Sequence, residues 1–193
     1  MIQQSLNLGT TAGDGTGGGL RDTFIITEAN ITNLFKVKGW GFYVDSLATP
    51  SISIDTTFTE ITIDDLGASI KNFLPREIRG SGELFSANKI TPISDGDTYG
   101  GRLDIRVDSK SGSPTLIEII IDISGGAAGT NKVFTGYIQT GGTIPYDQSI
   151  LFDFFSRTTF LANGGKIYAR TDSGSVTITN RNLFIERKYK GDI

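Results

Sequence analysis

Hydrophobic residues along this chain recur at two periods, a helical one near the N-terminus and a strand-like one over the remainder. Between residues 20 and 36 the apolar positions are spaced by three, four and seven, while charged residues fall on other faces. The apolar stripe consists of Leu20, Phe24, Ile31, Leu34 and Phe35. This spacing predicts a helix of about four turns, with Thr16 or Asp14 as its N-cap and Gly39 beyond its end.

The predicted helix needs a surface on which to bury its stripe, because a helix of about 15 residues is only marginally stable alone in water. That surface could belong to the rest of the chain, to copies of the helix or to a different protein. Residues 1–19 are rich in Gly and Thr and hold too few apolar side chains to form a core. They predict an extended arm, so residues 1–36 are expected to form an attachment unit ahead of a domain at 37–193.

From residue 37 onward apolar and polar residues alternate in short runs, which is the pattern of half-buried β-strands. Leu103, Ile105 and Val107 alternate with charged residues, so one face of this strand is expected in the core and the other in water. In residues 115–123 isoleucines form one face, and the mixed second face could meet a neighbouring molecule. The other candidate strands are 40–44, 51–54, 58–63, 132–139, 149–155, 166–170, 175–179 and 182–190.

Roughly nine or ten short strands separated by Gly-rich turns, with no second amphipathic helix, predict an all-β fold. The expected architecture is an antiparallel β-sandwich or jelly roll with an N-terminal extended arm and one short α-helix. We find no internal repeat, which argues against a propeller or a β-helix. The sheet edges must be covered, and a ring of identical subunits would cover them.

Charge and composition exclude several classes of function. The chain carries 18 basic and 21 acidic residues without a long run of either sign, so no nucleic-acid partner is expected. It shows neither a signal-peptide pattern nor an apolar run long enough to cross a bilayer, so no membrane partner is expected. Without cysteine it can form neither disulfides nor thiolate metal sites.

The absence of both histidine and cysteine removes the usual nucleophile–base pairs and all imidazole metal sites. Asp64–Asp65 and Asp95–Gly96–Asp97 are the remaining candidates for paired-carboxylate chemistry or calcium ligation. Asp and Gly also build turns through side-chain hydrogen bonds to the backbone, and this structural interpretation is favoured for both. No catalytic residue, metal ligand or cofactor is therefore expected, and we predict that the chain is not an enzyme.

Two further motifs favour structural interpretations. The Gly-rich run at residues 13–19 could surround a phosphate, but no strand precedes it and no GK[ST] sequence closes it, so a flexible arm is favoured. Asp153 lies among Phe152, Phe154 and Phe155 and could line a sugar site. Phenylalanines at alternating positions more often fill a sandwich interior, so core packing is favoured here.

The stretch NLGTTAGDGTGGGLRDTFIITEANITNLF at residues 7–35 resembles an N-terminal motif of tailed-bacteriophage structural and fibre proteins. The later part of the chain is similar in pattern to the jelly-roll domain of phage head-fibre, decoration and tail-fibre proteins. That similarity runs from Gly39–Trp40–Gly41–Phe42–Tyr43 through Asp64–Asp65–Leu66–Gly67, Leu74–Pro75 and Asp97 to Leu103–Asp104–Ile105–Arg106–Val107.

The resemblance implies a homotrimer on the surface of the virion, whose N-terminal segment docks on the particle while the β domain projects outward. The expected partners are further copies of the chain, the phage capsid or other virion proteins, and a host-surface glycan if the tip binds one. The expected apolar anchor comprises Leu20, Phe24, Ile31, Leu34 and Phe35, with Arg21 and Asp22 as its polar rim. A capsid head fibre or decoration protein is the leading interpretation; a tail fibre, adaptor or receptor-binding domain and a carbohydrate-binding module remain alternatives.

Overall fold

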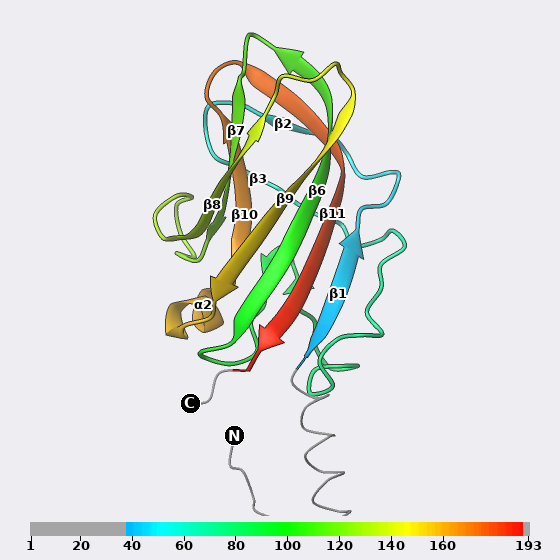
Figure 1. Ribbon diagram of the computed structural model, residues 1–193, viewed down its shortest axis with the longest axis vertical. Helices are drawn as coiled ribbons and strands as arrows, with labels where there is room; N and C mark the ends of the chain where they lie inside the picture. The colour runs from blue at the N-terminus through cyan, green and yellow to red at the C-terminus, as the bar shows by residue number, and fades with distance from the viewer. Residues whose placement is uncertain (1–37, 191–193) are drawn as a thin grey trace, which may run out of the picture. The chain divides into compact units, whose positions relative to one another are not determined.

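The computed structural model describes residues 38–190. The arm, the helix predicted for residues 20–36 and all seven predicted docking residues lie outside this range, as does the proposed domain boundary at residue 36, so those expectations stay predictions. The described residues confirm an all-β fold of antiparallel sheets, and they include one short helix at a different place from the predicted one (Figure 1).

Two antiparallel sheets and a small hairpin contain all the strands of the described range. The first sheet has the order β1–β11–β6–β9, with β2 also paired to β11, and the second has the order β3–β10–β7–β8. The strands of the first sheet are β1 (Gly39–Val44), β2 (Ile52–Ile54), β6 (Thr98–Ser111), β9 (Tyr146–Phe155) and β11 (Ser175–Tyr189). Those of the second are β3 (Thr59–Glu60), β7 (Leu116–Asp122), β8 (Lys132–Gln139) and β10 (Lys166–Thr171). The hairpin joins β4 (Phe85–Ser86) to β5 (Lys89–Ile90).

This strand order is that of a jelly roll. β1 pairs with residues 182–187 of β11 and β2 with residues 176–178, so the two short strands act as one interrupted strand along a single edge of β11. Each sheet then has four strand positions. The chain passes between the sheets from β2 to β3, from β3 through the hairpin to β6, from β6 to β7, from β8 to β9, from β9 to β10 and from β10 to β11. Eight positions in two packed antiparallel sheets, filled in this sequence, define the fold.

The core lies between the sheets and consists of the inward residues that the alternation predicts. Leu103, Ile105 and Val107 of β6 are each no more than 1% exposed, and they share one hydrophobic cluster with Ile117, Ile119 and Ile121 of β7. The mixed second face of β7 differs in part from the expectation, since Ile120 on that face is also fully buried within this chain. Ile120 is therefore not available to a neighbouring molecule.

Three local features depart from the sequence prediction. The two strands expected at 175–179 and 182–190 are one strand, β11, bent by a bulge in which Asn180 adopts φ +47°. The strand expected over 58–63 is reduced to β3. A helix of six residues, α2 (Thr158–Asn163), was not predicted; it buries Phe160 in the core, and no described helix is long and apolar enough to cross a membrane.

The free edge of β1 is covered by the chain itself rather than by another subunit. The N–H groups of Trp40 and Phe42 donate to the carbonyls of Phe73 and Ile70 at 2.8 and 2.9 Å, and the N–H of Ile70 returns a bond to Phe42 at 2.8 Å. We call residues 67–74 the edge segment. It satisfies backbone groups that would otherwise offer a template to another strand, so this edge needs no ring of subunits.

Candidate interaction surface

The first candidate carboxylates, Asp64 and Asp65, build a turn. Asp64 accepts hydrogen bonds from the backbone N–H groups of Ser46 at 2.8 Å and Leu66 at 3.0 Å. Burial raises the pKa of Asp64, but its hydrogen bonds outweigh that effect and hold the pKa well below its ordinary range. Asp65 pairs with Lys71. The structural interpretation of this pair is confirmed.

The second candidate, Asp95–Gly96–Asp97, is a turn with a further role. Gly96 has φ +77°, and the N–H of Gly96 donates to the Asp95 side chain at 2.9 Å. Asp97 is fully buried, and its carboxylate lies 2.9 Å from Nε of Arg187, whose guanidinium is also fully buried and contacts Glu77. Asp97 is thus held in an ion pair inside the domain and faces no open cleft.

A second buried ion pair joins Asp45 to Arg181 where the first strand is interrupted. Nε of Arg181 lies 2.5 Å from the Asp45 carboxylate, and the two side chains are 0% and 1% exposed. The other oxygen of Asp45 accepts the N–H of Asp64 at 2.9 Å. The loop between β1 and β2 therefore lies against the bulge of β11, and the Asp45–Arg181 ion pair links these two segments.

Sequence reasoning missed both buried arginines, although one left a signal. Arg187 is two residues beyond Ile185 and four beyond Leu183, and both of these face the core. Strict alternation along β11 would therefore have placed Arg187 in the core as well. Arg181 is two residues before Leu183 but lies in the bulge at residues 180–181, just outside the strand predicted at 182–190. Among the described residues no cluster of three or more acidic side chains could hold a metal ion.

The residues around Asp153 divide between the core and the surface. Phe152 and Phe154 are 5% and 3% exposed and fill the interior, as the core interpretation predicted, whereas Phe155 is 67% exposed. Asp153 points outward on β9 and binds Lys188 of β11 at 2.6 Å. Gly100 of the intervening strand β6 has no side chain, so the side chain of Lys188 can cross over it to reach Asp153.

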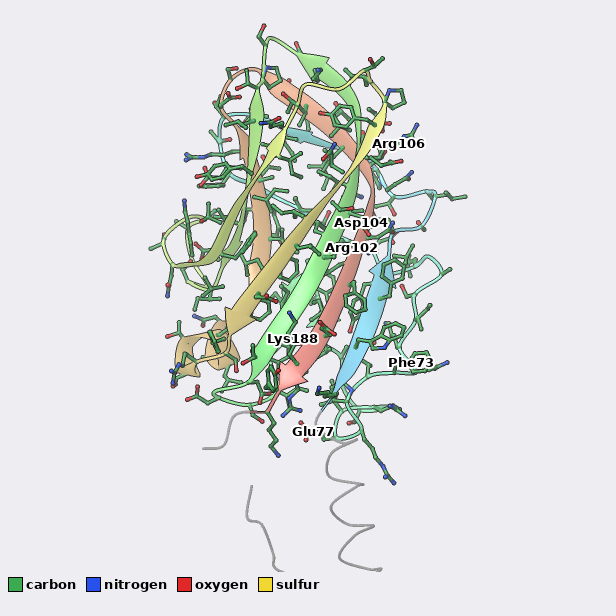
Figure 2. All side chains as sticks on the ribbon, viewed as in Figure 1. Phe73, Glu77, Arg102, Asp104, Arg106 and Lys188 are labelled. Atoms are coloured by element: carbon green, nitrogen blue, oxygen red, sulfur yellow. The ribbon has the colours of Figure 1, made fainter. Side chains whose placement is uncertain are left out.

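The outer face of the first sheet, formed by β1, β11, β6 and β9, carries aromatic residues beside paired charges. One row across the strands reads Phe42, Phe184, Arg102 and Leu151. Next to it Trp40 stacks on Phe73 of the edge segment, with their ring centroids 4.7 Å apart. We call this surface the outer face; Figure 2 shows Arg102, Asp104 and Arg106 along β6, with Phe73 beside β1 and Lys188 near the end of β11.

Most charges on the outer face are already paired within the chain. Arg102 lies 3.0 Å from Asp104, and Arg106 lies 3.1 Å from Asp108. A shallow hollow of about 400 Å³ lies over Gly101, bordered by Phe184, Leu151 and Lys188. Aromatic and arginine side chains on a broad surface are typical of protein contact surfaces, and this composition makes the outer face a candidate interaction surface.

No protein-family model and no curated protein matches the chain. Structures with some likeness include "PRD1 vertex protein P5", which is 16% identical over 78% of this chain and 95% of that chain, with a TM-score of 0.43. A protein of Bacillus endospore appendages, described as a novel family of disulfide-linked pili, is 14% identical over 80% and 90%, with a TM-score of 0.38. A chain of Broad Bean Stain Virus is 9% identical over 80% and 85%, with a TM-score of 0.28. At these values the likenesses assign neither a family nor a function to the chain.

Proposed function

We propose that the chain is a non-enzymatic structural protein of a tailed-bacteriophage particle, a head fibre or decoration protein on the capsid surface. The observation that carries the proposal is a jelly-roll domain directly following a segment, residues 7–35, that resembles phage attachment motifs. Jelly rolls recur in viral capsid proteins as well as in lectins and cupins, so the fold alone leaves the role open. The combination with the N-terminal segment favours the particle.

The contacts that the candidate carboxylates make within the domain support a role without catalysis. Asp64 and Asp65 are engaged in turn hydrogen bonds or an ion pair, and Asp97 is buried against Arg187. A general acid or a nucleophile must reach its substrate. These side chains instead hold loops and strands in place.

The two ends of the domain differ in a way that suits attachment. Residues 1–37 join the described domain at the end where β1 begins, and Gly39 pairs there with Arg187 near the end of β11. The loops at 112–115, 140–145 and 172–174 lie at the opposite end of the sandwich, at the top in Figure 1. We call these three loops the tip.

The proposal includes a homotrimer, and we assign the contact between copies to the outer face. Leu151 and Phe155 of β9 are 73% and 67% exposed there. Light scattering coupled to gel filtration should give three times the chain mass, and Leu151→Lys should lower that mass. Leu47→Lys, a change at a fully exposed loop residue, should leave it unchanged. A monomeric wild-type chain would remove the trimer from the proposal.

Imaging of purified virions by cryo-electron microscopy tests the assignment to the particle. Wild-type particles should show density on the capsid lattice that is missing from particles lacking the chain. Loss of density at the tail instead would favour the tail-fibre or adaptor alternative. If the two kinds of particle are identical everywhere, the chain is not a virion component and the proposal is wrong.

A further inference from the structure

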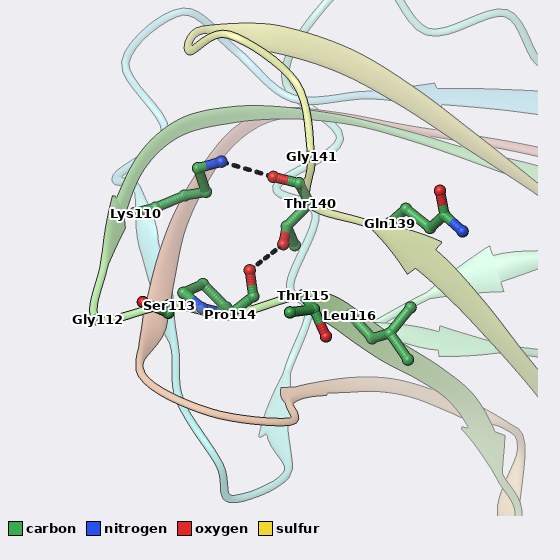
Figure 3. A pocket seen from close by; sticks show the side chains of 9 residues that line it. All are labelled: Lys110, Gly112, Ser113, Pro114, Thr115, Leu116, Gln139, Thr140 and Gly141. Carbon is green, nitrogen blue, oxygen red and sulfur yellow. Dashed lines mark hydrogen bonds between the residues drawn. The ribbon is translucent and has the colours of Figure 1, made fainter.

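The tip of the sandwich holds an open cavity that is larger than the hollow on the outer face. It measures about 660 Å³ and lies between the β6–β7 turn and the loop that follows β8 (Figure 3). Its lining includes the polar side chains of Ser113, Thr115 and Gln139, and more of its surface is apolar than polar. An open cavity of this volume is wide enough for a small organic molecule to bind against its walls.

Lys110 is the single charged residue among those that line the cavity. Its ammonium donates to the carbonyls of Thr140 at 2.6 Å and Gly142 at 3.3 Å, as Figure 3 shows for Thr140. None of the ion pairs between described residues includes Lys110. Since an ammonium has three N–H donors, one donor and the whole positive charge remain for a ligand that carries an anionic group.

The loops around the cavity are tied to one another, so its shape is preorganised. The Thr140 hydroxyl donates to the carbonyl of Pro114, which joins the β8 loop to the β6–β7 turn. The Ser173 hydroxyl donates to the carbonyl of Ser113 at 2.8 Å, which joins that turn to the loop between β10 and β11. A preformed site spares a ligand the entropic cost of ordering loops.

The remainder of the lining suits a body with many hydroxyl groups. Gln139 and Ser113 are exposed and offer amide and hydroxyl groups, while the half-buried Leu116 adds apolar surface suited to the C–H groups of a ring. A simple carboxylate would fill only a small part of the cavity. We propose that the tip binds a carboxylated monosaccharide, with Lys110 holding the carboxylate and the loop backbone and polar side chains holding the hydroxyls.

Titration calorimetry and saturation-transfer NMR on the purified full chain test this proposal with sodium glucuronate, sodium N-acetylneuraminate, glucose and sodium acetate. At least one sugar acid should bind. Glucose and acetate should bind about tenfold more weakly or not at all, because glucose lacks the carboxylate and acetate lacks the hydroxyl groups. Lys110→Gln should weaken sugar-acid binding by about tenfold or more. The matched control Lys188→Gln removes the same charge near the end of β11, at the opposite end of the sandwich from Lys110, and should have no effect.

Each contrary result overturns a defined part of the inference. If neither sugar acid binds, or if binding survives in Lys110→Gln, the site is not this cavity. If acetate binds as well as the sugar acids, or if a glutamate-containing tetrapeptide binds in their place, the ligand is not a saccharide. Thermal unfolding verifies that both variants are folded. None of these outcomes depends on the virion assignment, which the imaging experiment tests separately.

Discussion

At the scale of single residues, the domain keeps two arginines in its interior, and each has a carboxylate partner. Arg181 and Arg187 are both fully buried, and they contact Asp45 and Asp97 respectively. The terminal nitrogens Nη1 and Nη2 of Arg181 form no hydrogen bond with any described residue. Asp45 therefore supplies the charge compensation for this guanidinium, and a buried charge without such a partner is costly.

We predict that Asp45→Asn will lower the free energy of unfolding by about 3–5 kcal/mol, because it leaves the buried Arg181 charge without a partner. Urea unfolding followed by tryptophan fluorescence measures the change. Asp104→Asn is the control, since it breaks an ion pair with the half-exposed Arg102 and such pairs contribute about 0–1 kcal/mol. Equal effects of the two substitutions would show that Asp45 does not compensate a buried charge.

A second prediction concerns acid and Asp172. The Thr115 hydroxyl and backbone N–H donate to this carboxylate and lower its pKa from 3.8 to about 2. A carboxyl whose pKa is depressed by folding stabilises the native state above its unfolded pKa and loses that contribution as the pH falls through the folded pKa. Thr115→Val should therefore destabilise the protein more at pH 5 than at pH 2.

Urea unfolding at the two pH values, together with an NMR titration of the Asp172 carboxyl, tests this prediction. The titration should show a higher Asp172 pKa in Thr115→Val than in the wild type. Ser109→Ala, at an exposed position of β6, serves as the control. A stability loss in Thr115→Val that is the same at both pH values would contradict the link to Asp172.

At the scale of elements, alternation predicts a strand well where the strand is regular and poorly where it is bent. β6 appears in the sequence as residues 102–108 because Leu103, Ile105 and Val107 alternate with charges without interruption. The alternation predicted two strands in place of β11, because after the bulge the buried residues change from even-numbered to odd-numbered positions. α2 is too short to show a helical period, and it depends on the burial of Phe160.

The close packing of β6 against β9 gives a prediction for Gly101. A Cβ atom at this position would lie 2.3 Å from the Phe152 ring and 2.7 Å from the carbonyl of Phe184. Gly101→Val should therefore displace Phe152 from the core and lower the free energy of unfolding by about 1–3 kcal/mol or more. Thermal unfolding measures the loss. Gly126→Ala, where no atom lies within 4 Å of the added Cβ, should be nearly neutral.

At the scale of the whole molecule, composition and strand spacing were sufficient to predict a β-sandwich but not its contacts. The tip cavity was beyond prediction because it is assembled from two segments whose residues are distant in sequence, such as Lys110 and Thr140. The docking residues, such as Leu20 and Phe24, were inferred from spacing and resemblance and await a direct test. Local periodicity thus predicts which face of a strand is buried, whereas a site built from loops can be located only once the three-dimensional structure is known.

We predict that Leu20→Asp combined with Phe24→Asp will reduce docking of the full chain on the particle by at least tenfold, because charges replace the apolar anchor. Cosedimentation with virions that lack the chain measures docking. Leu47→Asp, a change at a fully exposed loop residue, should dock as the wild type does. Undiminished docking of the double variant would show that attachment uses another part of the chain.

The pairing of β1 with β11 also constrains when the domain can form. The first strand of the sandwich binds the last, with Gly39 opposite Arg187, so almost the whole domain must leave the ribosome before that pair can close. Contacts between distant parts of a chain slow folding. A chain whose synthesis stops before β11 would leave β1, β2 and β6 without a shared partner. Premature termination should therefore yield no partial sandwich, and such chains should be degraded by cellular proteases.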